Sequence, residues 1–375
     1  CAATLEALRS RRGGLRPNDL EGVALDTWIG RVAGVEDAPL GAGLAAFDCR
    51  NNRLAALGLR ADGFEAAVAR ARGRYGAERI ALLLGTTTSG IAESERAFAQ
   101  RGTAGELPAW FRYRETHNLF SVCDFVQRQL GLRGPATTIS TACSSSAKVF
   151  ASAQRLVEAG LADAAVVGGV DSLCLMTLYG FNSLQLLSST PCRPCDAARD
   201  GLSIGEAAGF ALLEPARPGA GLALLGYGES SDAYHMSSPH PDGEGAAAAM
   251  RAALERAGAE PAQVDYVNLH GTGTPANDRA EDAAAFGLFG AEVACSSTKG
   301  WTGHALGAAG IVEAVISLLC LRHGLIPGSL NLESVDPALK SRIAVAPEER
   351  PLARVLSNSF GFGGNNCSLL FGTLA

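Results

Sequence analysis

Hydrophobic residues follow two different periods along this chain and predict alternating helices and strands. Amphipathic stretches with helical spacing predict helices at 64–75, 119–130, 144–159, 246–257 and 307–323. Short apolar or β-branched runs bounded by Gly or Pro predict buried strands at 79–86, 135–141, 163–170, 264–270 and 292–296, and two more strands around a glycine turn within 354–372. Strands that alternate with helices are typical of layered α/β folds.

Two segments of the chain share one local order and predict two similar halves. Both "TISTACSSSAKVFASA" (138–153) and "ACSSTKGWTGHALGAAGIVEA" (294–314) run from a strand through a turn of small residues into an apolar helix. Such a weak internal repeat favours a duplicated architecture. No Ser-rich or charged linker separates the repeats, so we expect halves at 1–214 and 215–375 that share one core.

The composition removes several classes of function. The net charge is −6 and the basic residues are scattered, so we expect no nucleic-acid binding. We expect no membrane span and no secretory signal, because we find no apolar run of sufficient length and no basic segment before one. The ten cysteines are irregularly spaced, which is typical of reduced thiols in a cytoplasmic protein. Cys192 and Cys195 form one CxxC pair without further ligands at zinc-site spacing, so we expect no metal.

Cys143 stands at the turn between a predicted strand and a predicted helix. The first backbone N–H groups of a helix are unpaired, and its dipole is positive there, so both favour a thiolate at this position. The same N–H groups can hold an oxyanion. Small neighbours leave room for a substrate. The alternative is a buried structural cysteine, and the local sequence alone leaves both interpretations open.

Three further side chains stand where a predicted strand ends or a predicted helix starts. His270 ends the strand in "NLHGTGTPAND", and Lys299 and His304 lie in "STKGWTGHALG" before the apolar helix. Two imidazole N–H groups at one site can stabilise a developing enolate. Taken singly, each histidine is better explained by structure alone: His270 as a packed strand-end histidine and His304 as a capped helix start. The loop "SFGFGGNN" adds backbone N–H groups, but it lacks the GK[ST] of a phosphate loop.

In combination, these motifs resemble those of the β-ketoacyl-acyl-carrier-protein synthases, the condensing enzymes of fatty-acid and polyketide assembly. The resemblance covers about residues 80–375 and rests on "GLRGPATTISTACSSS", "PCRPCDAARDGLSIGEAAGF", "SSDAYHMSSPHPDG", "VNLHGTGTPANDRAE", "SSTKGWTGHALGAAGIVEA" and "NSFGFGGNN". It implies a thiolase-like fold, in which two βαβαβαββ halves stack as five α/β/α/β/α layers and usually form dimers. It also implies an apolar first strand, which we expect to be missing before Cys1.

The resemblance implies a role for each matching residue. Cys143 would carry the acyl chain as a thioester, and His270 and His304 would hold the malonyl thioester oxygen during decarboxylation. Lys299 and Glu313 would fix the electrostatics, and the backbone N–H groups of Cys143 and Phe362 would form the oxyanion hole. The remaining expected contacts are with the pantetheine arm or the acyl chain: Thr272, Thr274, Phe360, Ile91 and Phe181, with Phe362 as a gate.

The implied partners are an acyl carrier protein and a second subunit, either a copy of this chain or a related synthase-like chain. The carrier would bring the phosphopantetheine, so no free cofactor is expected. Carriers are acidic, and Arg70, Arg72 and Arg74 could form a docking patch, although a solvated helix face explains them as well. Two other functions stay open: a catalytically silent chain-length subunit and a cysteine-dependent thioester hydrolase.

Overall fold

The first of two large sheets comes from the N-terminal part of the chain. In the computed structural model, which describes residues 1–217, 219 and 221–374, its strand order is β4-β3-β5-β7. These strands are β3 (Ile80–Gly85), β4 (Ala136–Ile139), β5 (Ala164–Asp171) and β7 (Ala207–Leu213). β3 is parallel to β4 and β5, and β7 is antiparallel to β5. β3 and β5 are fully buried apolar runs, as expected for parallel strands covered on both faces.

The second sheet has the order β12-β10-β9-β14-β15-β8. Its strands are β8 (Gly221–Ser231), β9 (Tyr266–Asn268), β10 (Ala294–Ser296), β12 (Arg342–Ile343), β14 (Arg354–Gly361) and β15 (Asn365–Leu374). The cores β4-β3-β5-β7 and β10-β9-β14-β15 share one pattern, with two parallel neighbours and a final antiparallel strand. Strand β8 lies beside β15, whereas no described strand lies on the outer side of β7.

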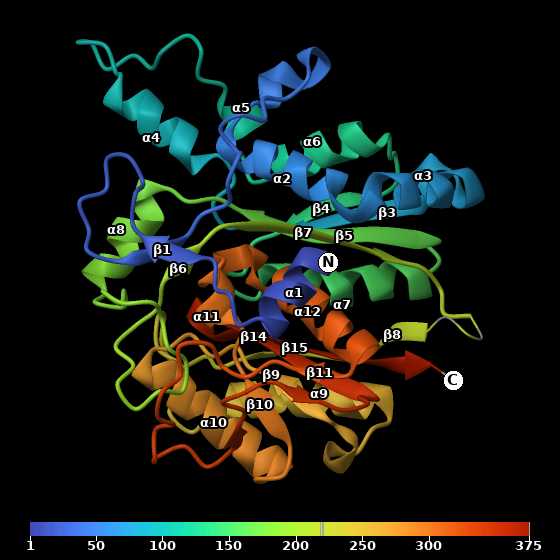
Figure 1. Ribbon diagram of the computed structural model, residues 1–375. Coiled ribbons are helices and arrows are strands. Elements are labelled where there is room, and N and C mark those ends of the chain that lie inside the picture. Colours follow the sequence, from blue (N-terminus) through green and yellow to red (C-terminus); the bar gives the residue numbers. More distant parts are fainter. Residues whose placement is uncertain (218, 220, 375) are drawn as a thin grey trace.

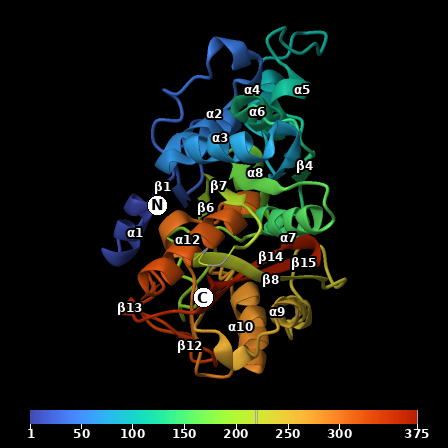
Figure 2. The same ribbon diagram turned by 90° about the vertical axis from the view of Figure 1, so that its right-hand side faces the viewer.

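Helices complete a stack of five layers (Figures 1 and 2). α7 (Ser145–Glu158) and α12 (Ala309–His323) lie between the sheets, with α7 on β3 and β5 and α12 between β7 and β14. The outer layers are α2 (Arg50–Arg60), α3 (Phe64–Tyr75) and α6 (Ser121–Leu130) on one side, and α9 (Glu244–Ala257) and α10 (Pro275–Phe289) on the other. This is the α/β/α/β/α thiolase-like fold that the resemblance implied. The division at residues 214 and 215 stays a prediction.

Smaller elements surround these layers. They are α1 (Ala2–Arg9), β1 (Leu15–Pro17), β2 (Trp28–Gly30), α4 (Ile91–Ala99), α5 (Tyr113–Thr116), α8 (Leu175–Ser183), β6 (Ile204–Gly205), α11 (Lys299–Thr302), β11 (Leu325–Ile326) and β13 (Glu348–Glu349). β1, β2 and β6 form a small sheet of their own. The parallel bridge between Ile204 and His304 joins β6 to the segment before α12.

One segment is more apolar than the sequence analysis expected. Leu306–His323 is long enough to cross a membrane, with a mean hydropathy of 1.5, so the expectation that no run reaches this length is wrong. However, 72% of the segment is buried inside the protein, where α12 lies between the two sheets. A helix covered by protein on both sides has to be apolar all round, which explains the composition.

Candidate active site

The turn that carries Cys143 is held by its neighbouring hydroxyl groups. Ser145 Oγ accepts the Thr141 N–H at 2.9 Å, and Ser144 Oγ donates to Thr141 O at 2.9 Å. Ala142, which directly follows Thr141, adopts a left-handed φ of 52° and bends the chain sharply from β4 into α7. Cys143 stands two residues before the first residue of α7 and is only 5% exposed. The fold therefore places the thiol at the amino end of a buried helix.

His304 lies directly against this thiol. Its Nε2 is 3.1 Å from Cys143 Sγ, and its Nδ1 accepts the backbone N–H of Leu306 at 3.2 Å. A ring nitrogen that accepts a hydrogen bond carries no proton, so the proton of the neutral ring is on Nε2. His304 therefore presents an N–H donor at the position of the thiol.

His270, just after β9, presents the same kind of donor. Its ring centre is 5.2 Å from that of His304, and the planes are nearly perpendicular. The Lys299 ammonium lies 3.2 Å from His270 Nδ1, and an ammonium can only donate, so Nδ1 is again the acceptor and Nε2 bears the proton. The backbone N–H of His270 donates to Glu281 Oε1 at 2.7 Å, which fixes the end of β9.

A buried pair of opposite charges lies next to the two imidazole rings. Lys299 forms an ion pair with Glu313 of α12, and both side chains are almost fully buried. Burial raises the pKa of Glu313 to about 7, against the opposing effect of Lys299. Burial, followed by the nearby Lys299 charge, holds the pKa of His270 and that of His304 well below the usual value. Both imidazoles are therefore neutral at pH 7, and each keeps one N–H donor, on Nε2.

The thiol itself does not have the low pKa that its position suggested. Burial raises the pKa of Cys143 to about 11, while Lys299 and the backbone N–H of Phe362 act in the opposite direction. The expectation that the helix terminus favours a thiolate is therefore wrong for the free protein, because desolvation outweighs it. The sulfur still lies beside a donor that stabilises the anion once it forms.

Alkylation of Cys143 by iodoacetamide should therefore accelerate with pH. The reactive thiolate is scarce at pH 7 and should increase about tenfold per pH unit up to a pKa of about 11. Cys49 and Cys123, with pKa values raised to about 12, should react later. Peptide mass spectrometry measures the alkylation of each cysteine. A Cys1→Ser background removes the one exposed thiol among the described cysteines, which would otherwise react first. A Cys143 rate that is already maximal at pH 7 would contradict this electrostatic description.

The aromatic residues of the expected site gather at the glycine loop between β14 and β15. Phe362 stacks on Phe181 of α8, with ring centres 5.5 Å apart at 26°. Phe360 lies 6.2 Å from the His270 ring. The hydroxyls of Thr272 and Thr274 are 2.9 Å apart at the start of α10. The structure thus connects Phe362 with Phe181 and Phe360 with His270, while the roles of all five residues stay predictions.

Ile91 belongs to a different surface. It lines an apolar groove of about 460 Å³ between α4 and α8, and Cys143 is not among the residues of this groove. The other lining residues are Ser94, Glu95, Phe98, His117, Leu175, Met176 and Tyr179. A tunnel role for Ile91 stays a prediction.

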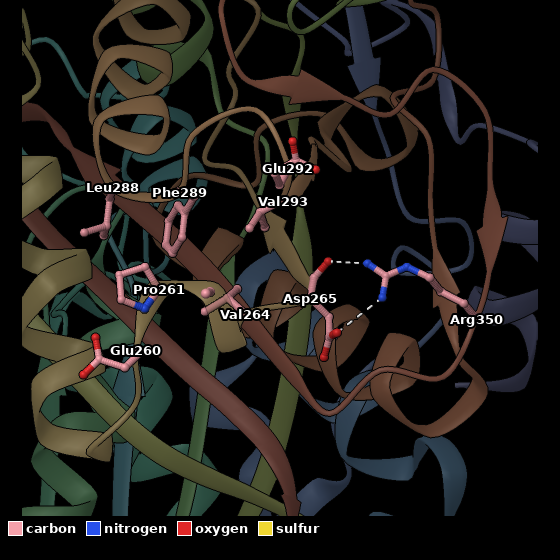
Figure 3. A pocket seen from close by; sticks show the side chains of 10 residues that line it. Glu260, Pro261, Val264, Asp265, Leu288, Phe289, Glu292, Val293 and Arg350 are labelled. Atoms are coloured by element: carbon pink, nitrogen blue, oxygen red, sulfur yellow. Dashed lines mark hydrogen bonds and ion pairs between the residues drawn. The ribbon is translucent and has the colours of Figure 1, made fainter.

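A second cavity, of about 490 Å³, has no cysteine and no histidine among its lining residues (Figure 3). Its wall includes Pro261, Leu288 and Phe289, and an ion pair between Asp265 and Arg350 at 3.3 Å closes one side. None of the expected site residues lines it, and its lining has no cysteine, serine or threonine. It therefore has no place in the chemistry of Cys143.

Sequence reasoning missed three buried carboxylates near the site. Glu281 accepts the N–H groups of His270 and Gly271, and Asp278 accepts those of Gly273 and Cys195. Asp171 receives donors from both halves of the chain, as described below. Glu281 and Asp278 lie within the quoted motif "NLHGTGTPANDRAE", and their spacing after His270 was the available signal.

Two groups of described residues have ligand atoms close enough for a metal ion. One is Cys143, His270 and His304 themselves, with ligand atoms within 4.8 Å of one another. The other is His240, Asp242 and Glu244 near the surface. The CxxC pair belongs to neither group: the Cys192 thiol donates to Lys299 O at 3.3 Å, and the Cys195 N–H donates to Asp278.

Comparison with known proteins places these features in one family. Residues 63–218 match the model of the beta-ketoacyl synthase N-terminal domain, and residues 222–333 match that of the C-terminal domain. The mitochondrial 3-oxoacyl-[acyl-carrier-protein] synthase of Arabidopsis thaliana is 42% identical over 270 residues, which are 66% of this chain and 59% of that protein. The 3-oxoacyl-[acyl-carrier-protein] synthase 2 of Rhizobium meliloti is 43% identical, over 64% of this chain and 61% of the relative. The match thus spans less than two thirds of these relatives.

Solved structures match over the whole chain. The ketosynthase ApeO of Xenorhabdus doucetiae, in complex with its chain length factor ApeC, gives a TM-score of 0.88 at 41% identity and covers 100% of this chain and 93% of that chain. A beta-ketoacyl synthase from Burkholderia phymatum gives 0.88 at 28% identity, covering 99% and 94%. With the two domain models in succession and a 41% identical relative that aligns over all of this chain and 93% of its own, this chain belongs to the β-ketoacyl synthase family.

Proposed function

We propose that this chain catalyses the decarboxylating condensation of an acyl chain with malonyl-acyl carrier protein. First, the Cys143 sulfur attacks the thioester of an acyl carrier, and the pantetheine thiol leaves. Malonyl carrier then loses carbon dioxide, and the electron pair of the broken bond becomes a carbanion that the thioester oxygen shares. The carbanion attacks the acyl-Cys143 carbonyl, and the cysteine sulfur leaves. The product is a 3-oxoacyl carrier protein.

The observation that carries this proposal is the pair of Nε2–H donors next to one thiol. Cys143 Sγ lies 3.1 Å from His304 Nε2, and His270 is the neighbouring ring. Two neutral donors are what a thioester enolate requires, because its negative charge develops on oxygen as carbon dioxide leaves. The reaction requires no free cofactor, since the carrier supplies the pantetheine.

Incubation with an acyl carrier and malonyl carrier tests the proposal. The expected result is a 3-oxoacyl carrier, two carbons longer than the acyl chain, together with one carbon dioxide for each product. Free fatty acid without any elongated product would contradict it. We also propose that the chain acts in the cytoplasm and that its product enters fatty-acid or polyketide synthesis.

The geometry also argues against the two other functions. A cysteine hydrolase of the triad type needs an acid that accepts from the Nδ1 of its histidine. Here a backbone N–H of Leu306 points at His304 Nδ1, and an ammonium points at His270 Nδ1. A silent chain-length subunit would have no need for the Cys143, His270 and His304 arrangement.

We propose further that the chain pairs with a second ketosynthase-fold subunit through the edge of β4. This strand ends its sheet, so the outer backbone groups have no partner strand in the described chain. Large exposed apolar side chains also lie on α4, on and directly after α8, and in the segment 107–120: Phe98, Leu107, Trp110, Tyr113, Leu119, Phe120, Met176, Tyr179 and Leu184. ApeO, at 41% identity, is seen in complex with a chain length factor, which supports a related chain as partner.

Thr138→Pro should weaken this association and leave the fold in place. The β3 register places Pro135, Thr137 and Ile139 on the inner ladder, so the N–H of Thr138 points outward. Proline removes that donor without breaking the inner ladder. Light scattering at micromolar concentration, on the chain alone and mixed with a chain-length-type subunit, should show a dimer for the parent in at least one of the two samples and no dimer for the variant. A parent that is monomeric and fully active would contradict the proposed pairing.

The carrier-docking patch on α3 stays a prediction with weaker support. Arg72 donates to Leu130 O at 2.7 Å, and Arg74 forms an ion pair with Glu214 at 2.9 Å. Of the three arginines, these two already have partners within the chain, as expected for a solvated helix face. An acidic carrier would have to compete with those contacts.

A further inference from the structure

Asp171 is a buried carboxylate that joins the two halves of the site. It ends β5, is fully buried, and accepts six hydrogen bonds. Five come from the loop Thr86–Thr88 after β3, and the sixth comes from the backbone N–H of Gly307 at 2.6 Å. In the described part of the chain it forms no ion pair, unlike the buried carboxylates Asp278 and Glu313. Its charge is therefore balanced entirely by neutral donors.

Gly307 belongs to the turn that orients His304. The backbone N–H of Leu306, one residue earlier, is the group that donates to His304 Nδ1. Leu306 has a left-handed φ of 52°, a strained conformation for a leucine, so neighbouring contacts must hold it. A Cβ on residue 307 would lie 2.8 Å from Asp171 Oδ2, which shows how closely the turn fits the carboxylate.

We propose that Asp171 is a positioning residue that sets the tautomer of His304 through the Gly307 and Leu306 turn. The carboxylate anchors the Gly307 N–H, and the anchored turn keeps Leu306 in its strained conformation. The Leu306 N–H then stays on Nδ1, which leaves the ring proton on Nε2 beside Cys143. The inference deepens the proposed function, because it assigns a control of the donor used in decarboxylation.

The Asp171→Asn variant should break the hydrogen bond from Gly307 while it keeps the bonds from the loop Thr86–Thr88 to Oδ1. Oδ1 accepts the backbone N–H groups of Thr87 and Thr88, and Oδ2 accepts that of Gly307. An amide accepts on one side only, so its NH₂ must face a backbone N–H on the other. Keeping the amide oxygen toward the two-donor side loses fewer bonds, so the variant should leave Gly307 without its acceptor.

Nitrogen NMR of selectively labelled histidine reads the tautomer without any assay of activity. The chain has six histidines, and His304→Ala assigns the signal of interest. The parent should show a protonated Nε2 and an unprotonated Nδ1 at His304. Asp171→Asn should show a mixture of tautomers, and Gly307→Ala should do the same because its Cβ pushes the turn off the carboxylate. The Thr87→Val control removes one hydroxyl donor, keeps the Gly307 bond, and should resemble the parent.

Carbon dioxide release from malonyl carrier supplies the second readout. A misplaced donor typically costs about 10²-fold in rate, and we expect a loss of that order for Asp171→Asn. The double variant Asp171→Asn/His304→Ala should be no slower than His304→Ala alone, because both changes act on the same group, the Nε2–H donor of His304. Thermal unfolding of each variant identifies any that does not fold.

The outcomes separate this inference from the proposed function. A parent tautomer in folded Asp171→Asn and Gly307→Ala variants would overturn the positioning role, as would a loss that adds to that of His304→Ala. A parent that releases no carbon dioxide would overturn the proposed function, while the NMR comparison would still decide the role of Asp171.

Discussion

Cys143→Ala should abolish acyl-enzyme formation and condensation completely. In the proposed reaction the sulfur forms the covalent bond to the acyl chain, and no neighbouring side chain among the described residues offers a replacement nucleophile of comparable reactivity. Ser144 is the nearest hydroxyl in sequence, but it donates to Thr141 O. Alanine fits the turn, because Cys143 makes its main polar contact only with His304. Intact mass after incubation with an acyl carrier should therefore show no adduct on a folded variant.

A second buried cysteine provides the matched control. Cys320 of α12 is fully buried in the core between the sheets, and burial raises its pKa further than that of Cys143. Cys320→Ala should keep the acyl adduct and lose only a little stability. An adduct that survives in Cys143→Ala would show that the nucleophile is another residue.

Replacing either histidine with alanine should slow decarboxylation strongly, by roughly 10²- to 10³-fold, since each replacement removes one donor from the developing oxyanion. The two variants should differ in the first half-reaction. His304→Ala also removes the only side-chain partner of the Cys143 sulfur among the described residues, so acyl transfer should slow too. His270→Ala should leave acyl transfer nearly unchanged, because the described hydrogen bonds join its ring to Lys299 and join the thiol to His304.

His323→Ala is the control for these variants, because this histidine lies at the far end of α12. It should keep both half-reactions. Stopped assays of carbon dioxide release and of the acyl adduct measure the two steps separately. Equal carbon dioxide release by the parent and by both active-site variants would mean that other donors stabilise the enolate.

Local sequence patterns predicted most of the layered fold correctly. The helix over 64–75 matches α3, and the run at 163–170 matches β5. Helix α6 ends before Gly131, which takes the left-handed φ of 63° typical of a helix terminus. By contrast, "LMTLYGFNS" has no clear helical period and contains Gly180, so α8 was not predicted.

The missed parts of the site depend on contacts between distant segments. Asp171 directly follows the predicted strand 163–170, but its donors lie 83 to 136 residues away in sequence, and no local pattern shows that they meet. The prediction of a low pKa for the Cys143 thiol was wrong for a similar reason. The turn position of Cys143 can be read locally, whereas its nearly complete burial follows from both halves packing together. Motif resemblance supplied what local chemistry could not, namely that Cys143, His270 and His304 meet.

Intact-mass analysis of the parent chain with an acyl carrier tests the central claim most directly. The predicted result is one acyl adduct per chain, located on the Cys143 peptide, which persists alone and disappears when malonyl carrier is added, as the 3-oxoacyl carrier forms. No adduct would contradict the claim that the chain is a condensing enzyme. An adduct that converts to free acid without malonyl carrier would contradict it as well, in favour of a hydrolase.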